Sequence, residues 1–223
     1  MGVGNKWAPN NPILKRMRDS ARDDGRRVFL SVLEYNPKAK VLDLGCNIGD
    51  FSEELAQKVG VPKIIGVDLE RSCSPIIDLC VCDLNGKLPF KDGEFDVICA
   101  SHIIEHLSET DTFLREIRRL LSLTGYAVIQ TPNLAAWHVI FWLMCSKQPT
   151  TAAISDELGL TYKERTHRRI FTLSGLIRLL KYHGFIIEKS LGSTYYPLWG
   201  VLARMACYID KWHSAYITVK VRK

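Results

Sequence analysis

The sequence predicts an α/β fold in which helices cover both faces of a doubly wound, mostly parallel sheet. Two observations predict it. Short apolar runs of strand length, such as 40–44, 63–68 and 95–100, alternate with longer stretches whose apolar residues recur at helical spacing. The first run also leads through a glycine-containing turn directly into a helical pattern. Such alternation is typical of parallel sheets, because each helix carries the chain back across the sheet.

Turn and capping residues divide the chain into the expected elements. Ser108 and Thr172 are expected to cap the N-termini of two helices, and Thr124 with Gly125 to end the first of these. Pro75 leaves room for only a loop or one turn between the second and third strands. The expected strands are 40–44, 63–68, 77–82, 95–100, 126–131, 185–190 and 215–221. The expected helices are 12–33, 49–59, 108–121 and 173–182.

The stretch 41–52, VLDLGCNIGDFS, reads as strand, glycine turn and helix. Gly45 allows a sharp bend, and Gly49 allows the helix to start close to a ligand, with its first N–H groups exposed. Asp68 ends the next strand about 20 residues further on, where a carboxylate can accept hydrogen bonds from ribose hydroxyls. Asp50 would repel a pyrophosphate. The sequence therefore predicts a nucleoside-containing cofactor without phosphates.

This stretch closely resembles motif I of class I S-adenosylmethionine-dependent methyltransferases, usually written D-x-G-x-G-x-G. It departs from the motif at Asn47, where the family more often has glycine; asparagine tolerates a left-handed backbone well. The resemblance extends from Lys40 to the end of the chain and is to the type 11-like, small-molecule group. It implies a Rossmann-like seven-stranded sheet, mostly parallel with the last strand antiparallel, and S-adenosylmethionine as cofactor.

The resemblance also implies roles for individual residues. Glycine-turn residues and Ser101 would hold the methionine end of the cofactor, Asp68 the ribose, and Asp83 the adenine amino group. For Asp83 there is an alternative, because it could instead cap the turn at Asn85. The expected cofactor-binding residues are Asp43, Gly45, Cys46, Asn47, Gly49, Asp68, Leu69, Asp83, Leu84 and Ser101.

Two histidines follow the fourth strand, where the resemblance places the reacting methyl group. His102 is the first candidate for a catalytic base and His106 the second, since a hydroxyl acceptor benefits from proton removal. The alternative for each is a structural histidine. The string His-x-x-Glu-His, which contains Glu105, with the later His167, also resembles the metal motif of small-RNA 2′-O-methyltransferases, except at its first position. Our first interpretation is a site without a metal.

Composition is that of a globular protein. The chain has 223 residues, of which 47% are hydrophobic and 24% charged, and its formal net charge of +6 is too small to require nucleic acid. Seven cysteines without paired CxxC spacing predict a reduced, cytoplasmic protein. The longest apolar run, 134–145, is too short to span a bilayer. We expect a single methyltransferase domain over 1–223. Its parts are an N-terminal tail and helix (1–36), a cofactor-binding core (37–131), a lid or acceptor insertion (132–171) and the C-terminal part of the sheet (172–223).

The preferred function is methyl transfer from S-adenosylmethionine to a small molecule, at oxygen. Apolar segments at 137–144 and 199–205 favour an acceptor with an apolar part, such as a lipid or a quinone. Two alternatives remain. The basic helix 12–33 could serve an RNA methyltransferase, although the simpler interpretation of its charges is a solvated face. A catalytically silent cofactor-binding or partner-binding module is the other. The sequence is compatible with a monomer or a homodimer.

Overall fold

The computed structural model describes residues 12–69, 74–149, 167–198 and 200–223. Its centre is a seven-stranded sheet in the order β3-β2-β1-β4-β5-β7-β6. Strand β7 pairs antiparallel with both β5 and β6, whereas the pairs from β3 through to β5 are parallel, which confirms the predicted sheet. The strands are β1 (Val41–Leu44), β2 (Ile64–Asp68), β3 (Ile77–Val81), β4 (Phe95–Ser101), β5 (Leu121–Pro132), β6 (Ile186–Ser193) and β7 (Tyr216–Arg222).

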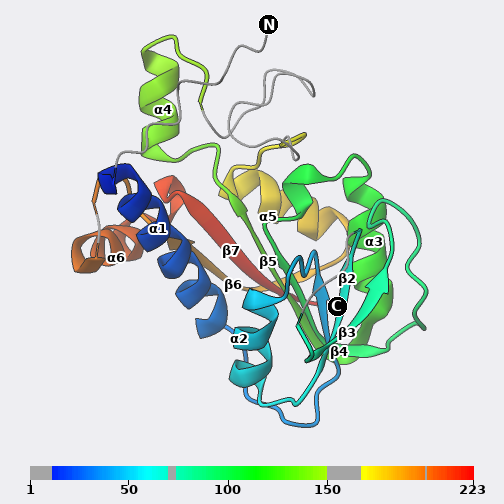
Figure 1. The fold of residues 1–223 in the computed structure, drawn as a ribbon. Helices are drawn as coiled ribbons and strands as arrows, with labels where there is room; N and C mark the ends of the chain where they lie inside the picture. The colour runs from blue at the N-terminus through cyan, green and yellow to red at the C-terminus, as the bar shows by residue number, and fades with distance from the viewer. Residues whose placement is uncertain (1–11, 70–73, 150–166, 199) are drawn as a thin grey trace, which may run out of the picture.

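Helices cover both faces of this sheet (Figure 1). On one face lie α1, α2 and α6, and on the other lie α3 and α5. Each face has its own cluster of buried hydrophobic side chains. Phe29 and Leu55 belong to the first cluster, and Phe113 and Leu176 belong to the second. The helices are α1 (Pro12–Ser31), α2 (Asp50–Val59), α3 (Thr110–Leu120), α4 (Trp137–Met144), α5 (Leu173–Tyr182) and α6 (Gly200–Ile209), with 3-10 turns η1 (Ile104–His106) and η2 (Lys211–His213).

Several predicted boundaries agree with the structure within two residues. Gly60, with φ of 89°, ends α2 and donates its N–H to Ala56. Thr172 caps α5 by accepting a hydrogen bond from the N–H of Gly175 at 3.1 Å. No helix lies between β2 and β3 in the residues described there, although 70–73 fall outside them. The predicted loose tail, 1–10, and the stretch 150–166 of the predicted insertion also lie outside the described residues.

The prediction for the boundary between α3 and β5 was wrong. Helix α3 ends at Leu120, and β5 begins at the next residue rather than at Tyr126, because Leu121 already pairs with Phe95 of β4. The register then shifts, and a Cβ on Gly125 would lie 2.9 Å from the carbonyl oxygen of Asp96. Gly125 therefore permits close approach of two strands and does not end a helix.

The N-cap predicted for α3 was also wrong. The cap position is Glu109, whose own side chain makes no capping hydrogen bond. Instead, the side-chain oxygen of Asn85 accepts hydrogen bonds from the N–H groups of Ser108 at 2.9 Å and Glu109 at 3.0 Å. A residue distant in the sequence thus satisfies donors at the start of this helix.

Candidate active site

The turn between β1 and α2 requires a left-handed backbone at three positions. The φ angles are 83° at Gly45, 48° at Asn47 and 90° at Gly49. Any side chain on Gly45 would also meet Ile103, whose Cδ1 atom would lie 3.0 Å from the new Cβ. Helix α2 begins immediately after this turn, so its first N–H groups face the carboxyl edge of the sheet. The strand, glycine turn and helix predicted from the sequence are therefore present.

Below the turn lies a buried carboxyl group. Asp43 is 3% exposed and accepts a hydrogen bond from the hydroxyl of Ser52 at 2.5 Å. Burial raises the pKa of Asp43 to about 6, and the nearby carboxylates of Asp68 and Asp50 add to this effect, while the Ser52 hydrogen bond opposes it. Asp43 thus supports the turn from inside the protein.

Replacement of Asp43 by asparagine is expected to change the pH dependence of stability. Because folding raises the pKa of Asp43, the stability that this group contributes is complete below pH 3.8, the pKa of the unfolded state. It is lost as the pH rises through about 6, the pKa of the folded state. Between about pH 5 and pH 8 the free energy of unfolding of the wild type should therefore fall by roughly 1–1.5 kcal/mol relative to that of Asp43→Asn. Urea unfolding at both pH values measures this difference. In Asp92→Asn, which removes an acid of lowered pKa that is paired with Arg119 and not with Asp43, the difference from wild type should stay constant over that range.

Cys46 contributes only backbone to the surface of the turn. Its side chain is buried, and its sulfur lies so close to Gly66 of β2 that a Cβ there would come within 2.7 Å. Burial, with the charges of Asp43 and Asp68, raises the pKa of the Cys46 thiol to about 12. The thiol therefore stays protonated and is not a nucleophile.

Asp68 lies at the end of β2 and is 4% exposed. One carboxylate oxygen accepts a hydrogen bond from the N–H of Asn47 at 2.9 Å, and the other from the N–H of Leu69 at 2.8 Å. Asp68 thus fixes the glycine turn from the carboxyl end of β2. Beside it, the apolar side chains of Leu69 and Ile48 are 66% and 58% exposed. Such exposure at a sheet edge suits a surface that a ligand covers.

Asp83 caps the turn at Asn85, as the alternative interpretation predicts, and its predicted contact with adenine stays a prediction. Its carboxylate accepts hydrogen bonds from the N–H and the side-chain amide of Asn85, both at 2.9 Å, and so caps the turn. Leu84 is buried in the core beneath this turn. The sequence analysis did not predict the role of Asn85. Its amide nitrogen donates a hydrogen bond to Asp83, and its side-chain oxygen accepts one from the N–H of Ser108 at the start of α3. The Asn-Gly pair indicated only a turn.

The segment after β4 brings His102 to the same edge of the sheet. His102 has a positive φ of 53°, and its N–H donates to the carbonyl of Gln130 at 2.9 Å. Its ring lies edge-on against Tyr216, with 4.9 Å between ring centroids. Ser101, the last residue of β4, is half-buried, and its hydroxyl lies 3.5 Å from the side-chain oxygen of Gln130. Contacts with β5 and β7 thus fix the imidazole that follows β4.

Glu105 is the buried acid of this segment, with 1% of its side chain exposed. One carboxylate oxygen, Oε2, accepts a hydrogen bond from the Thr131 hydroxyl at 3.0 Å. The other, Oε1, lies 3.4 Å from Nδ1 of His102, which is long for a hydrogen bond. Burial alone would raise the pKa of Glu105, but the neighbouring imidazole of His102, a backbone N–H and the imidazole of His106 lower it below its usual range. Glu105 is therefore a carboxylate at neutral pH.

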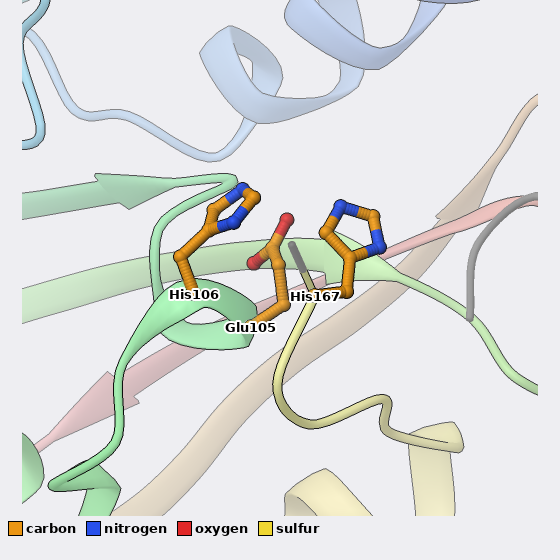
Figure 2. Close-up of side chains that lie close together, drawn as sticks. All are labelled: Glu105, His106 and His167. Carbon is orange, nitrogen blue, oxygen red and sulfur yellow. The ribbon is translucent and has the colours of Figure 1, made fainter. Parts of the chain in front are cut away.

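Two further histidines flank Glu105 (Figure 2). His106 follows it on η1, and His167 comes from the segment before α5; their rings lie 4.9 Å apart. Donor atoms of all three side chains lie within 4.8 Å of one another. The backbone explains this proximity, since the carbonyl of Glu105 accepts hydrogen bonds from the N–H groups of Arg168 and Arg169.

Helix α1 reaches the glycine turn through ion pairs. Asp50, the first residue of α2, lies 2.6 Å from Arg22 and 2.5 Å from Arg26, and Arg26 also pairs with Glu54 at 2.7 Å. These pairs favour the solvated-face interpretation of the charges on α1, and they offset the charge of Asp50. A cavity of about 240 Å³ lies between α1 and α6, lined by Ala21 and Ala203 among others, and contains none of the predicted site residues.

Comparisons with known proteins identify the family. The methyltransferase-domain family matches residues 13–190. A malonyl-[acyl-carrier protein] O-methyltransferase of Legionella pneumophila is 30% identical over 132 residues, covering 52% of this chain and 45% of that protein. A ubiquinone/menaquinone biosynthesis C-methyltransferase of Geotalea uraniireducens is 26% identical over 154 residues, covering 60% and 64% of the two chains. The matches thus span about half to two thirds of these relatives.

A solved structure agrees with this family at the level of the fold. It is a SAM-dependent methyltransferase of Thermotoga maritima, described as a possible histamine N-methyltransferase, with a TM-score of 0.66, 17% identity and 95% of both chains covered. The chain belongs to the methyltransferase-domain family, within the class I methyltransferases that depend on S-adenosylmethionine.

Proposed function

We propose that this chain binds S-adenosylmethionine across the carboxyl ends of β1, β2 and β4 and transfers its methyl group to an oxygen of a partly apolar small molecule. The observation that carries the proposal is the glycine turn, whose left-handed residues are tied to the buried carboxylate of Asp68. A turn of this kind exposes backbone N–H groups to the methionine end, while Asp68 accepts hydrogen bonds from the ribose.

The other predicted contacts are assigned around this centre. The backbone of Gly45, Cys46, Asn47 and Gly49 lies along the methionine end, with Asp43 below it and Ser101 beside it. Leu69 covers the ribose side. Asp83 keeps a free lone pair for the adenine amino group while it caps its turn, and the backbone of Leu84 lines the same end.

The residues of the chain position the acceptor and remove its proton. When bound, S-adenosylmethionine supplies a methyl group activated on sulfonium sulfur, so an acceptor oxygen bonds to the methyl carbon as the carbon–sulfur electron pair returns to sulfur. The chain holds the two reactants in line, which contributes on the order of 7–11 kcal/mol. His102 turns Nδ1 toward Glu105, which leaves Nε2 to take the hydroxyl proton, with the carboxylate stabilising the imidazolium.

Support for a partly apolar acceptor comes from the exposed side chains of α4. Phe141 is 61% and Met144 80% exposed, on a helix that belongs to the insertion proposed to shape the acceptor side. The names of the two relatives also include an O-methyltransferase and a quinone-pathway C-methyltransferase. None of the described helices is both long and apolar enough to cross a membrane.

Calorimetry and a transfer assay together test this function. Titration with S-adenosylmethionine, and with its demethylated product, should show one binding site per chain. Asp78→Ala, which alters an exposed strand residue paired with Lys63, should bind as the wild type does. Tritiated-methyl transfer to an extract of small molecules should then label an apolar product. Absence of heat with both compounds contradicts the proposal; heat without any transfer supports a silent binding module instead.

A further inference from the structure

Side chains from two separate segments of the chain bring three metal-binding groups together beside the proposed active site. Glu105 and His106 lie on η1, and His167 lies in the segment that leads into α5. Donor atoms of these residues all lie within 4.8 Å of one another, and Figure 2 shows the carboxylate of Glu105 between the two imidazole rings. No other such cluster occurs in the part of the chain that the structure describes.

One atom of this cluster has an unsatisfied bonding requirement. Oε1 of Glu105 is buried and makes no hydrogen bond of good geometry, since Nδ1 of His102 lies 3.4 Å away, whereas Oε2 accepts a hydrogen bond from the hydroxyl of Thr131. A buried carboxylate oxygen without a partner costs the folded state free energy, so such atoms in native proteins call for an explanation. A cation bound by the carboxylate would satisfy this oxygen.

The arrangement around the cluster is the kind that orients metal ligands. The Thr131 hydroxyl fixes the carboxylate of Glu105, and metal-binding carboxylates are usually held in this way by a second group. Hydrogen bonds from the N–H groups of Arg168 and Arg169 to the Glu105 carbonyl, at 2.8 Å and 3.1 Å, keep the adjacent His167 next to this acid. Both histidines are half-buried, as is usual for ligands of an ion that solvent can reach.

We propose that Glu105, His106 and His167 bind one divalent transition-metal ion. Two imidazoles and one carboxylate suit zinc, manganese, iron(II) or cobalt, whereas magnesium and calcium prefer sites made of oxygen alone. The separation of up to 4.8 Å exceeds the roughly 3.4 Å between ligand atoms of a tetrahedral site with zinc–nitrogen distances near 2.1 Å. The side chains therefore close around the ion as it binds.

Three protein ligands leave coordination positions open, which is typical of catalytic rather than structural metal sites. This site follows the end of β4, three residues after His102. A catalytic role for the ion rests on the proposed function: the acceptor oxygen binds at an open coordination position of the metal. The ion then lowers the pKa of the acceptor hydroxyl and stabilises its anion before methyl transfer. His106 is thereby a ligand rather than a base.

Metal binding is tested without any assay of activity. Untagged, chelator-treated protein is titrated with cobalt(II) and then zinc, followed by calorimetry and by the visible absorption of bound cobalt. We expect one ion per chain. Glu105→Gln, which keeps an acceptor for Thr131, His106→Ala and His167→Ala should each weaken binding at least tenfold. His183→Gln should leave it unchanged, because His183 pairs with Asp111 at 2.7 Å and lies outside the cluster.

The outcomes separate the metal site from the function of the chain. Failure of the wild type to bind cobalt or zinc, or binding that survives all three substitutions in proteins with normal thermal unfolding, overturns the site. S-adenosylmethionine binding is measured in the same chelator-treated samples, so loss of the cofactor site is seen independently. If transfer proceeds equally with and without chelator while cobalt binding is intact, the catalytic role is overturned.

Discussion

Alanine in place of Asp68 is expected to weaken S-adenosylmethionine binding by roughly 10- to 100-fold. The substitution deletes a charged acceptor for the ribose hydroxyls, worth about 1.5–3 kcal/mol. It also removes the oxygen that holds the N–H of Asn47, so the glycine turn loses a support. Because both effects act on the bound cofactor, the loss should be near the upper end of this range. Calorimetric titration measures it directly.

Two further variants show which effect dominates. Asp68→Asn keeps an acceptor for the turn but removes the charge, so its affinity should lie between those of the wild type and Asp68→Ala. Asp78→Ala, on the neighbouring strand, should leave affinity unaltered. An Asp68→Ala protein that is folded and binds with wild-type affinity would show that the ribose does not lie at the end of β2.

Replacement of His102 by alanine is expected to reduce turnover by on the order of 10²–10⁴-fold, the usual contribution of a general base. Cofactor affinity should change little, because the backbone at this position, not the imidazole, would face the methionine end. The positive φ of 53° means that alanine adds some local strain, so His102→Asn, which tolerates that backbone, is the better-folded comparison. Turnover and cofactor affinity are measured on both variants.

His183→Gln controls for the loss of an arbitrary histidine and should retain full turnover. A His102→Asn enzyme with undiminished turnover would remove His102 as the base. If turnover falls together with cofactor affinity, His102 serves the binding site rather than proton transfer.

Most of the fold follows from local patterns in the sequence. The runs at 40–44, 63–68 and 95–100 are mostly apolar, as is typical of strands that helices cover on both faces. Gly60 and Thr172 mark helix ends by local chemistry. The boundary near Gly125 was mispredicted because a helix-ending glycine and a glycine that allows two strands to approach look alike in sequence. Only the pairing of Leu121 with Phe95 distinguishes them.

The candidate site was predictable where one short motif carries it, as in the turn from Gly45 to Gly49. Contacts between distant segments were not. Asn85 caps a helix that starts 25 residues later, and no spacing rule links the two. The sequence placed His167 with Glu105 only by resemblance, whereas their closeness depends on backbone hydrogen bonds from Arg168 and Arg169. Long-range pairing of this kind leaves no periodic signal.

The ion pairs between α1 and α2 bear on how far the chain can be shortened from its N-terminus. Arg22 and Arg26 lie on a helix that precedes the sheet, yet they neutralise acids at the start of α2. Arg26 also stacks over Phe51, and Phe29 meets the same ring edge-on. A truncated protein that starts at β1 would expose Phe51 and leave the carboxylates of Asp50 and Glu54 without their arginine partners. A truncated variant that folds must therefore begin before Arg22.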